Sequence, residues 1–211
     1  LASPCFKPLH TQAVAMGCAA SGNEYTVTRK GGAFGKALEN GTMAVIKGKY
    51  FLDCLAKGRP FTHRAQIEKE YPQAIFPGKT AAKLWYEWGH FFLAVISYCW
   101  LSKEHPDPQM FYLPYLKAAI EDMKVRYDMK DVGIIMDYTS FYQEPRTEEQ
   151  KKSFKQCLSM INVPYGHKDV TAVKFVRVPE TERRAYDDRG WTKFESDVID
   201  SKPSAGTIGY G

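Results

Sequence analysis

The stretch that decides the fold is residues 91–100, which read FFLAVISYCW. Its first six residues are continuously apolar and partly β-branched, which is typical of a strand buried on both faces in a parallel sheet. The run then changes to side chains that can form hydrogen bonds, Ser97, Tyr98 and Trp100. We therefore predict a central strand over residues 91–96 with polar groups at its carboxyl end.

Two further segments have the character of strands. Residues 132–136 read VGIIM and stop at Asp137, and residues 170–178 carry Val or Phe at five of their nine positions. Both segments are short and rich in β-branched or aromatic residues, as strands are. The sequence therefore predicts three strands in the second half of the chain.

Helical periodicity fills the intervals between these strands. In the first interval, four apolar residues recur at helical spacing with charges between them: Leu113, Leu116, Ile120 and Met123. In the second, Thr147 and Gln150 match a capping box, and the helix that follows has this apolar stripe: Phe154, Cys157, Leu158 and Ile161. Each of these helices should pack on the sheet.

A last helix is predicted near the end of the chain. Asp187 or Asp188 is suited to cap it, and its apolar residues are Trp191, Phe194, Val198 and Ile199. Because large aromatic side chains dominate core burial, Trp191 is expected to lie in the core, and shielding a ligand or carboxylate is its alternative role.

Strands and helices that alternate in this way predict an α/β domain over residues 91–200, with a right-handed, doubly wound parallel sheet. Residues 1–41 are glycine-rich and weakly periodic, so we expect an extended N-terminal arm. Residues 42–90 are expected to pack around the domain, with a short helix near residues 50–55 before prolines interrupt the segment. Residues 201–211 are expected to form a tail.

Bulk composition excludes several classes of protein. The chain has 211 residues and a net charge of +5, from 29 basic and 24 acidic residues, without the long basic run that would indicate a nucleic-acid partner. Its five cysteines have no metal-ligand spacing, so we expect neither a metal site nor a disulfide framework, and a reducing, intracellular compartment is expected. No apolar run reaches the ~20 residues of a membrane-spanning helix.

Residues 16–21 read MGCAAS, which matches the pattern for myristoylation of Gly17 with Cys18 placed for palmitoylation. Two acyl chains would hold the protein stably at a membrane surface. The motif requires Gly17 at the mature N-terminus, and fifteen residues precede Met16. Two readings stay open, a lipid-anchored protein with a processed or misassigned start and a chance match in a small-residue arm.

Candidate chemistry gathers where ligands bind an open parallel sheet, beyond the carboxyl ends of the strands. The ligand-binding candidates are Ser97, Tyr98 and Trp100 after the first strand, Asp137, Ser140 and Gln143 after the second, and Arg189 and Trp191 at the start of the last helix. Glu195 lies four residues after Trp191, so both should share one helical face.

Three blocks in this order, ISYCW, IIMDYTSFYQ and RGWTKFE, resemble the signature blocks of heterokaryon-incompatibility (HET) domains. The segment RPFTHR at residues 59–64 is also similar to sequences before the first block in related proteins, so the resemblance spans residues 59–200. The HET family is related to Toll/interleukin-receptor (TIR) domains, which implies a flavodoxin-like, TIR-like sheet. Some TIR domains cleave NAD with a glutamate in a similar context, and the resemblance implies Glu195 as the catalytic residue.

Two functions follow as hypotheses. The first is a HET/TIR-like protein-interaction or signalling module without turnover, tethered to a membrane if it is acylated. In one version it is a structural subunit of a larger assembly, which it contacts through the arm. The second is an NAD-cleaving hydrolase that uses Glu195, in which NAD is the substrate rather than a bound cofactor.

Overall fold

The structure is a computed structural model, and the residues it describes are 32–202 and 207–210. One sheet runs through the molecule in the strand order β1-β3-β2-β4-β5. The strands are β1 (Ile46–Lys47), β2 (Leu93–Ser97), β3 (Gly133–Ile135), β4 (Thr171–Phe175) and β5 (Thr207–Tyr210). β1 pairs antiparallel with β3, and all other neighbouring pairs are parallel. The fold is therefore a mixed α/β fold.

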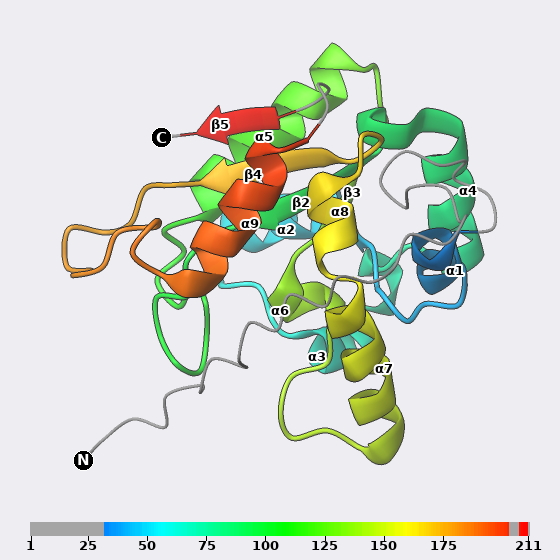
Figure 1. The fold of residues 1–211 in the computed structure, drawn as a ribbon, viewed down its shortest axis with the longest axis horizontal. Coiled ribbons are helices and arrows are strands. Elements are labelled where there is room, and N and C mark those ends of the chain that lie inside the picture. The colour runs from blue at the N-terminus through cyan, green and yellow to red at the C-terminus, as the bar shows by residue number, and fades with distance from the viewer. Residues whose placement is uncertain (1–31, 203–206, 211) are drawn as a thin grey trace.

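Helices surround this sheet. They are α1 (Ala33–Glu39), α2 (Gly48–Ala56), α3 (Arg64–Glu70), α4 (Gly78–Trp88), α5 (Leu113–Arg126), α6 (Asp137–Ser140), α7 (Glu148–Ser159), α8 (Asn162–Gly166) and α9 (Gly190–Asp200). Two short 3-10 turns, Pro72–Ala74 and Gly89–Phe91, flank α4. In Figure 1, α8 and α9 lie in front of the strands, with α2 and α5 behind them.

The two faces of the sheet support separate cores, because successive side chains of a strand point to opposite faces. Ala94 and Ile96 of β2 belong to one apolar cluster, which also contains residues of α2 and α5. Leu93 and Val95 belong to the other cluster, with residues of α1, α4 and α8. Every residue of β2 is buried, as the continuous apolar run predicted.

The three predicted strands and the first two predicted helices are confirmed, with changes at their ends. β2 begins at Leu93 because Gly89–Phe91 form a 3-10 turn. All four predicted apolar residues of α5 are buried, and α7 opens with the predicted capping box. In α7, however, Leu158 is exposed and only Cys157 is fully buried, so the predicted stripe was too wide.

A glycine explains how closely the chain packs around β3. A Cβ atom at Gly133 would lie 2.6 Å from Cγ1 of Val45 and 2.9 Å from Cζ of Phe92. Both contacts are shorter than real side chains allow, so only glycine lets the segment before β1 and the Phe92 ring close on this strand.

The expected N-terminal arm and C-terminal tail differ from the structure. The arm was expected to reach residue 41, but residues 33–39 form α1, whose Phe34 and Leu38 are buried against the sheet. Residues 42–90, expected only to pack around the domain, contribute β1 to the sheet itself. In the expected tail, Thr207–Tyr210 pair with β4 as a parallel strand. The α/β fold therefore includes more of the chain than residues 91–200.

The last helix is the clearest correction. α9 was expected to turn its aromatic residues inward, yet Trp191 is 47% and Phe194 45% exposed. Its buried face instead carries Thr192, Glu195 and Ser196 beside Ile199. Neither Asp187 nor Asp188 caps it, because Arg189 occupies the N-cap position and no side chain caps the helix there.

Candidate functional site

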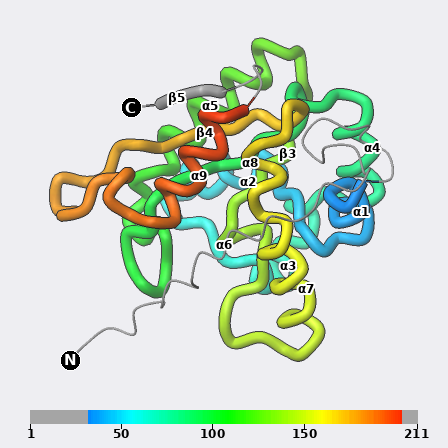
Figure 2. Tube along the Cα trace, viewed as in Figure 1, coloured from blue at the N-terminus to red at the C-terminus, as the bar shows by residue number. Residues whose placement is uncertain are grey.

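The candidate site lies beyond the carboxyl ends of β2 and β4. The chain leaves β2 toward β3 on one side and later returns to β4 on the other, which makes the β2–β4 junction the topological switch point where open α/β sheets bind ligands. The loops that follow these two strands extend on the same side of the molecule (Figure 2). Ser97 is the last residue of β2 and pairs in register with Lys174 of β4.

Glu195 reaches this strand end from α9. The Ser97 hydroxyl hydrogen-bonds one of its carboxylate oxygens, and the same hydroxyl also hydrogen-bonds the phenol of Tyr186. All three side chains are buried, with exposures of 3% or less. The three groups therefore form a continuous polar cluster sealed inside the protein.

The position of this cluster is fixed by contacts on every side. Tyr186 belongs to the loop between β4 and α9, and the Thr192 hydroxyl donates to its backbone carbonyl. Tyr165 of α8 donates its hydroxyl to the backbone carbonyl of Ile96 at 3.3 Å and also faces Glu195. Glu195 of α9 is thus held by Ser97 at the end of β2 and by Tyr165 of α8.

Burial determines the charge of Glu195. The loss of solvation raises the pKa of its carboxyl group to about 8, and the nearby charge of Asp137 acts in the same direction. Hydrogen bonds from Ser97, Tyr165 and Trp191 oppose that rise in the pKa without cancelling it. The side chain is therefore mostly protonated at neutral pH.

Asp137 is the second buried carboxylate of this region, and it is well supplied with donors. Its oxygens accept hydrogen bonds from the Tyr98 hydroxyl at 2.6 Å, the Trp100 indole N–H at 2.9 Å and the Tyr138 backbone N–H at 2.6 Å. Burial raises its pKa, while these three donors oppose the shift. Asp137 thereby ties the end of β2 to the turn after β3.

Ser140 and Gln143 make hydrogen bonds to the backbone of the turn after β3. The Ser140 hydroxyl accepts from the Met136 backbone N–H at 3.1 Å, and it is fully buried. The Gln143 side-chain amide donates to the carbonyls of Asp137 and Phe141 at 3.2 and 3.3 Å. Their polar atoms serve the backbone around them.

Arg189 connects the two loops that cover the site. One guanidinium N–H donates to the Trp100 carbonyl at 2.9 Å, and the same side chain pairs with Glu182 at 2.9 Å. Trp191, the next predicted ligand-binding residue, lies half-exposed beside Phe194, with ring centroids 6.0 Å apart. Arg189 therefore acts across the loops, and Trp191 presents its ring to the surface.

The structure brings Ser97 and Glu195 into direct contact, and Asp137 lies near them with Tyr98 and Trp100. Sequence reasoning missed Tyr186 and Tyr165, which complete the cluster. Tyr186 stands three residues before Arg189 in the third signature block, so proximity to that block was the signal that could have found it. Tyr165 lies within the short helix α8, a segment for which the sequence predicted no element.

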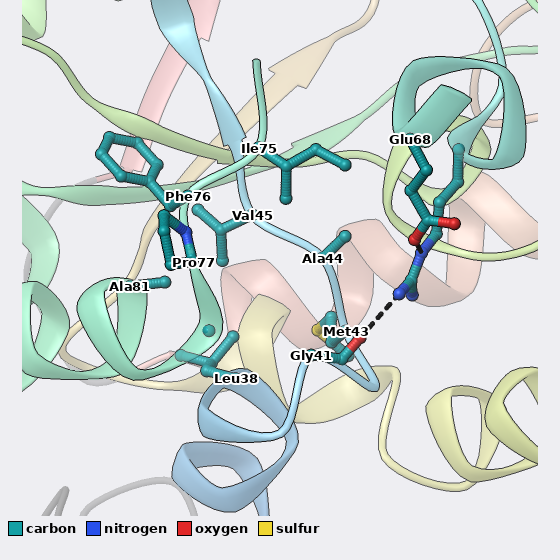
Figure 3. Close-up of a pocket in the computed structure, with 12 residues that line it drawn as sticks. Leu38, Gly41, Met43, Ala44, Val45, Glu68, Ile75, Phe76, Pro77 and Ala81 are labelled. Carbon is teal, nitrogen blue, oxygen red and sulfur yellow. Dashed lines mark hydrogen bonds and ion pairs between the residues drawn. The ribbon is translucent and has the colours of Figure 1, made fainter. Parts of the chain in front are cut away.

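Two hollows in the described part of the chain lie away from Glu195. One, of about 240 Å³, is lined mainly by apolar residues such as Leu38, Val45 and Ala81 (Figure 3). The other, of about 290 Å³, lies beside Tyr142 and Ser153. Arg64 borders both.

Arg64 is a structural clamp rather than a free cation. Its guanidinium donates to the carbonyls of Gly41, Thr42 and Ser140 at 2.7 to 3.1 Å and pairs with Glu68 at 2.9 Å. Because these partners use nearly all of its N–H groups, it offers little to an anionic ligand in either hollow.

The described residues, 32–202 and 207–210, show neither a metal site nor a membrane-spanning helix. No group of three or more His, Cys, Asp or Glu side chains there is arranged to hold a metal ion. None of the helices in that part of the chain has the length and apolar character needed to cross a bilayer. The proposed acylation sites Gly17 and Cys18 lie outside the described residues.

Comparison of the chain with protein-family models, with curated proteins and with solved structures gives no match.

Proposed function

We propose that this chain is a HET/TIR-like protein-interaction or signalling module, with the outer face of α9 as its recognition surface. The observation that carries the proposal is the exposed pair Trp191 and Phe194. The parallel strands lie in the order β3-β2-β4-β5, which is the order of a flavodoxin-like sheet and supports the TIR-like reading.

The chemistry of this face suits a protein partner. Trp and other aromatic residues are enriched at the centres of protein interfaces, where they supply large contact areas. Lys193, which lies between Trp191 and Phe194 in the sequence, forms an exposed ion pair with Asp197, so the helix also carries a charged group of each sign. The inner face of the same helix is buried through Thr192, Glu195, Ser196 and Ile199, so the exposed parts of the Trp191 and Phe194 rings are available for recognition.

Site-specific photo-crosslinking tests this surface. A photoreactive phenylalanine analogue at Phe194 should give a crosslinked protein partner in cells, and Trp191→Ala should remove that adduct. The matched control is the same analogue at Val125, which is 86% exposed on α5. Equal crosslinking at both positions, or an adduct that survives Trp191→Ala, would contradict the proposal.

The membrane tether and the assembly role are parts of the same proposal. Acylation at Gly17 and Cys18 would bring the module to a membrane surface, and an N-terminal arm is suited to contact a larger complex. Mass spectrometry of the mature N-terminus tests the tether. A myristoylated Gly17 is expected, and an unmodified Leu1 would end this part of the proposal.

A second candidate function is cleavage of NAD at the bond between nicotinamide and ribose. It is favoured by a specific observation, the placement of Glu195 and Ser97 at the switch point of the sheet. An ionised carboxylate there could stabilise the oxocarbenium-like ribose as nicotinamide leaves, as carboxylates do in glycoside cleavage. The sealed cluster would have to open for the dinucleotide to enter.

Nicotinamide release from purified protein incubated with NAD tests this activity. Glu195→Gln keeps the shape of the side chain and should abolish release, while Glu121→Gln on the exposed side of α5 should not. Because the ionised form is required, the rate should rise with pH, reach half its maximum near pH 8 and level off above it. Unchanged turnover in Glu195→Gln would remove Glu195 from the reaction, and no turnover at high protein concentration would leave the interaction module.

A further inference from the structure

The hydrogen bonds around Ser97 have a consequence for the proton of Glu195. A serine hydroxyl has one hydrogen, so it donates to one partner at a time and accepts from others. Ser97 contacts both the Glu195 carboxylate and the Tyr186 phenol. The direction of donation along the three groups therefore depends on whether Glu195 holds a proton.

We propose that Tyr186 is a positioning residue that sets the protonation of Glu195 through Ser97. When Glu195 is ionised, Tyr186 donates to Ser97 and Ser97 donates to the carboxylate. When Glu195 is protonated, both hydrogen bonds reverse, and Tyr186 becomes the acceptor at the far end. No atom is gained or lost within the pair of hydroxyl groups, because each keeps one hydrogen in both states.

The phenol is held where this role requires. Tyr186 is 2% exposed, and its backbone carbonyl is fixed by the Thr192 hydroxyl in the first turn of α9. Its hydroxyl has a pKa raised by burial, so it stays protonated and remains able to donate. That hydroxyl is hydrogen-bonded to the Ser97 hydroxyl.

Side chains from several elements face Glu195. They are Asp137 from α6, Tyr165 from α8, Trp191 from its own helix, and Tyr98 and Cys99 after β2. Asp137 is the one carboxylate among them, and its charge disfavours a second charge on Glu195. Neutral donors, the Ser97 and Tyr165 hydroxyls and the Trp191 indole, therefore stabilise the ionised form. Of these donors, Ser97 is the one that is itself hydrogen-bonded to a further hydroxyl group, that of Tyr186.

Removing the phenol hydroxyl should raise the pKa of Glu195. The two hydrogen bonds that link Tyr186, Ser97 and Glu195 are strengthened by a charge only when Glu195 is ionised. The ionised state therefore loses more stabilisation than the protonated state when Ser97 loses the Tyr186 donor. We expect Tyr186→Phe to raise the pKa by about half a unit to one unit. Replacing Tyr186 with a difluorotyrosine, a stronger donor, should lower it.

Carbon-13 NMR titration of labelled glutamate carboxyl groups in the full chain measures this pKa directly. Tyr112→Phe is the matched control, because Tyr112 is fully buried and its hydroxyl has no hydrogen-bond partner in the described residues. In a Ser97→Ala background, Tyr186→Phe should cause no further shift. The same pKa in wild type and Tyr186→Phe, or a shift that persists without Ser97, would overturn the proposal.

The inference rests on the glutamate of the second candidate function, but its test needs no NAD. If nicotinamide release fails while the pKa shifts as expected, the cluster is a proton-controlling site without that activity. If nicotinamide release depends on Glu195 but the pKa of Glu195 is unchanged in Tyr186→Phe, the activity is supported and the positioning role of Tyr186 is refuted. Should Tyr186→Phe fail to fold, the difluorotyrosine protein, which keeps the hydroxyl, still decides the question.

Discussion

Two buried carboxylates lie at the carboxyl ends of neighbouring strands, and their surroundings differ. Asp137 accepts hydrogen bonds from a phenol, an indole and a backbone N–H. Glu195 is hydrogen-bonded by the Ser97 and Tyr165 hydroxyls and the Trp191 indole, and the Ser97 hydroxyl is shared with Tyr186. Asp137 therefore links the segment after β2 to the turn after β3. Glu195 is the carboxyl group whose charge state can change near neutral pH. Unequal environments of this kind separate structural from functional acids.

The largest expected effect is the pH dependence that Glu195 gives to stability. Its folded pKa of about 8 lies above the usual value of 4.5, so the folded state holds a proton that the unfolded state has released between these values. Stability should fall as pH rises from 4.5 to 8, by up to the order of 5 kcal/mol, and then level off. Urea unfolding across this range measures the slope, which Glu195→Gln should largely remove. A wild-type slope retained in Glu195→Gln would assign the effect elsewhere.

The next effect should come from removing the other carboxylate. Asp137→Ala leaves the Tyr98 hydroxyl and the Trp100 indole N–H buried without their acceptor, which should cost about 3 kcal/mol of unfolding free energy. Asp137→Asn keeps one acceptor oxygen and should cost less. Urea unfolding at pH 7 compares the two variants. A cost below about 1 kcal/mol for Asp137→Ala would mean that the hydrogen bonds to Asp137 contribute little to the free energy of unfolding.

A smaller change tests one of the donors to Asp137. Tyr98→Phe removes the hydrogen bond of 2.6 Å to Asp137 and keeps the ring against Tyr112, so a loss of about 1.5 kcal/mol is expected. Thermal unfolding followed by circular dichroism measures it. Tyr86→Phe, on the half-exposed side of α4, is the control and should cost less than half as much.

The smallest effect is expected at Trp191. The sequence placed this ring in the core, where truncation would cost about 3 kcal/mol or more. At 47% exposure, and with one hydrogen bond to Glu195 to lose, Trp191→Ala should cost about 1 kcal/mol. Ile199→Ala, on the buried face of the same helix, is the contrast and should cost several times more. Equal losses in the two variants would mean that α9 is rotated relative to the structure.

Local patterns predicted those elements whose determinants lie within a few residues. The apolar run of β2, the stripe of α5 and the capping box of α7 needed no distant partner, and each was correct. The face of α9 was predicted wrongly because its buried polar residues are satisfied from elsewhere. Glu195 finds Ser97, 98 positions earlier, and Ser196 lies within hydrogen-bonding distance of Lys174. Hydrophobicity alone assigns such residues to the surface.

The candidate site followed the same rule. Strand-end logic placed Ser97, Asp137 and Glu195 in one region, because the carboxyl ends of parallel strands share an edge of the sheet. It could not show that Asp137 is saturated by Tyr98 and Trp100, since that depends on side-chain directions. Nor could it identify Tyr186, whose position is set by the turn into α9.

The antiparallel strand β1 also bears on how the chain is made. Ile46 pairs with Ile134, which emerges from the ribosome 88 residues later. At roughly 5 to 20 residues per second, β3 is synthesised roughly 4 to 18 seconds after β1. During vectorial synthesis β1 is therefore without its β3 partner for this time, and of the pairings that Ile46 makes in the folded sheet only the isolated bridge to Ile75 can form earlier.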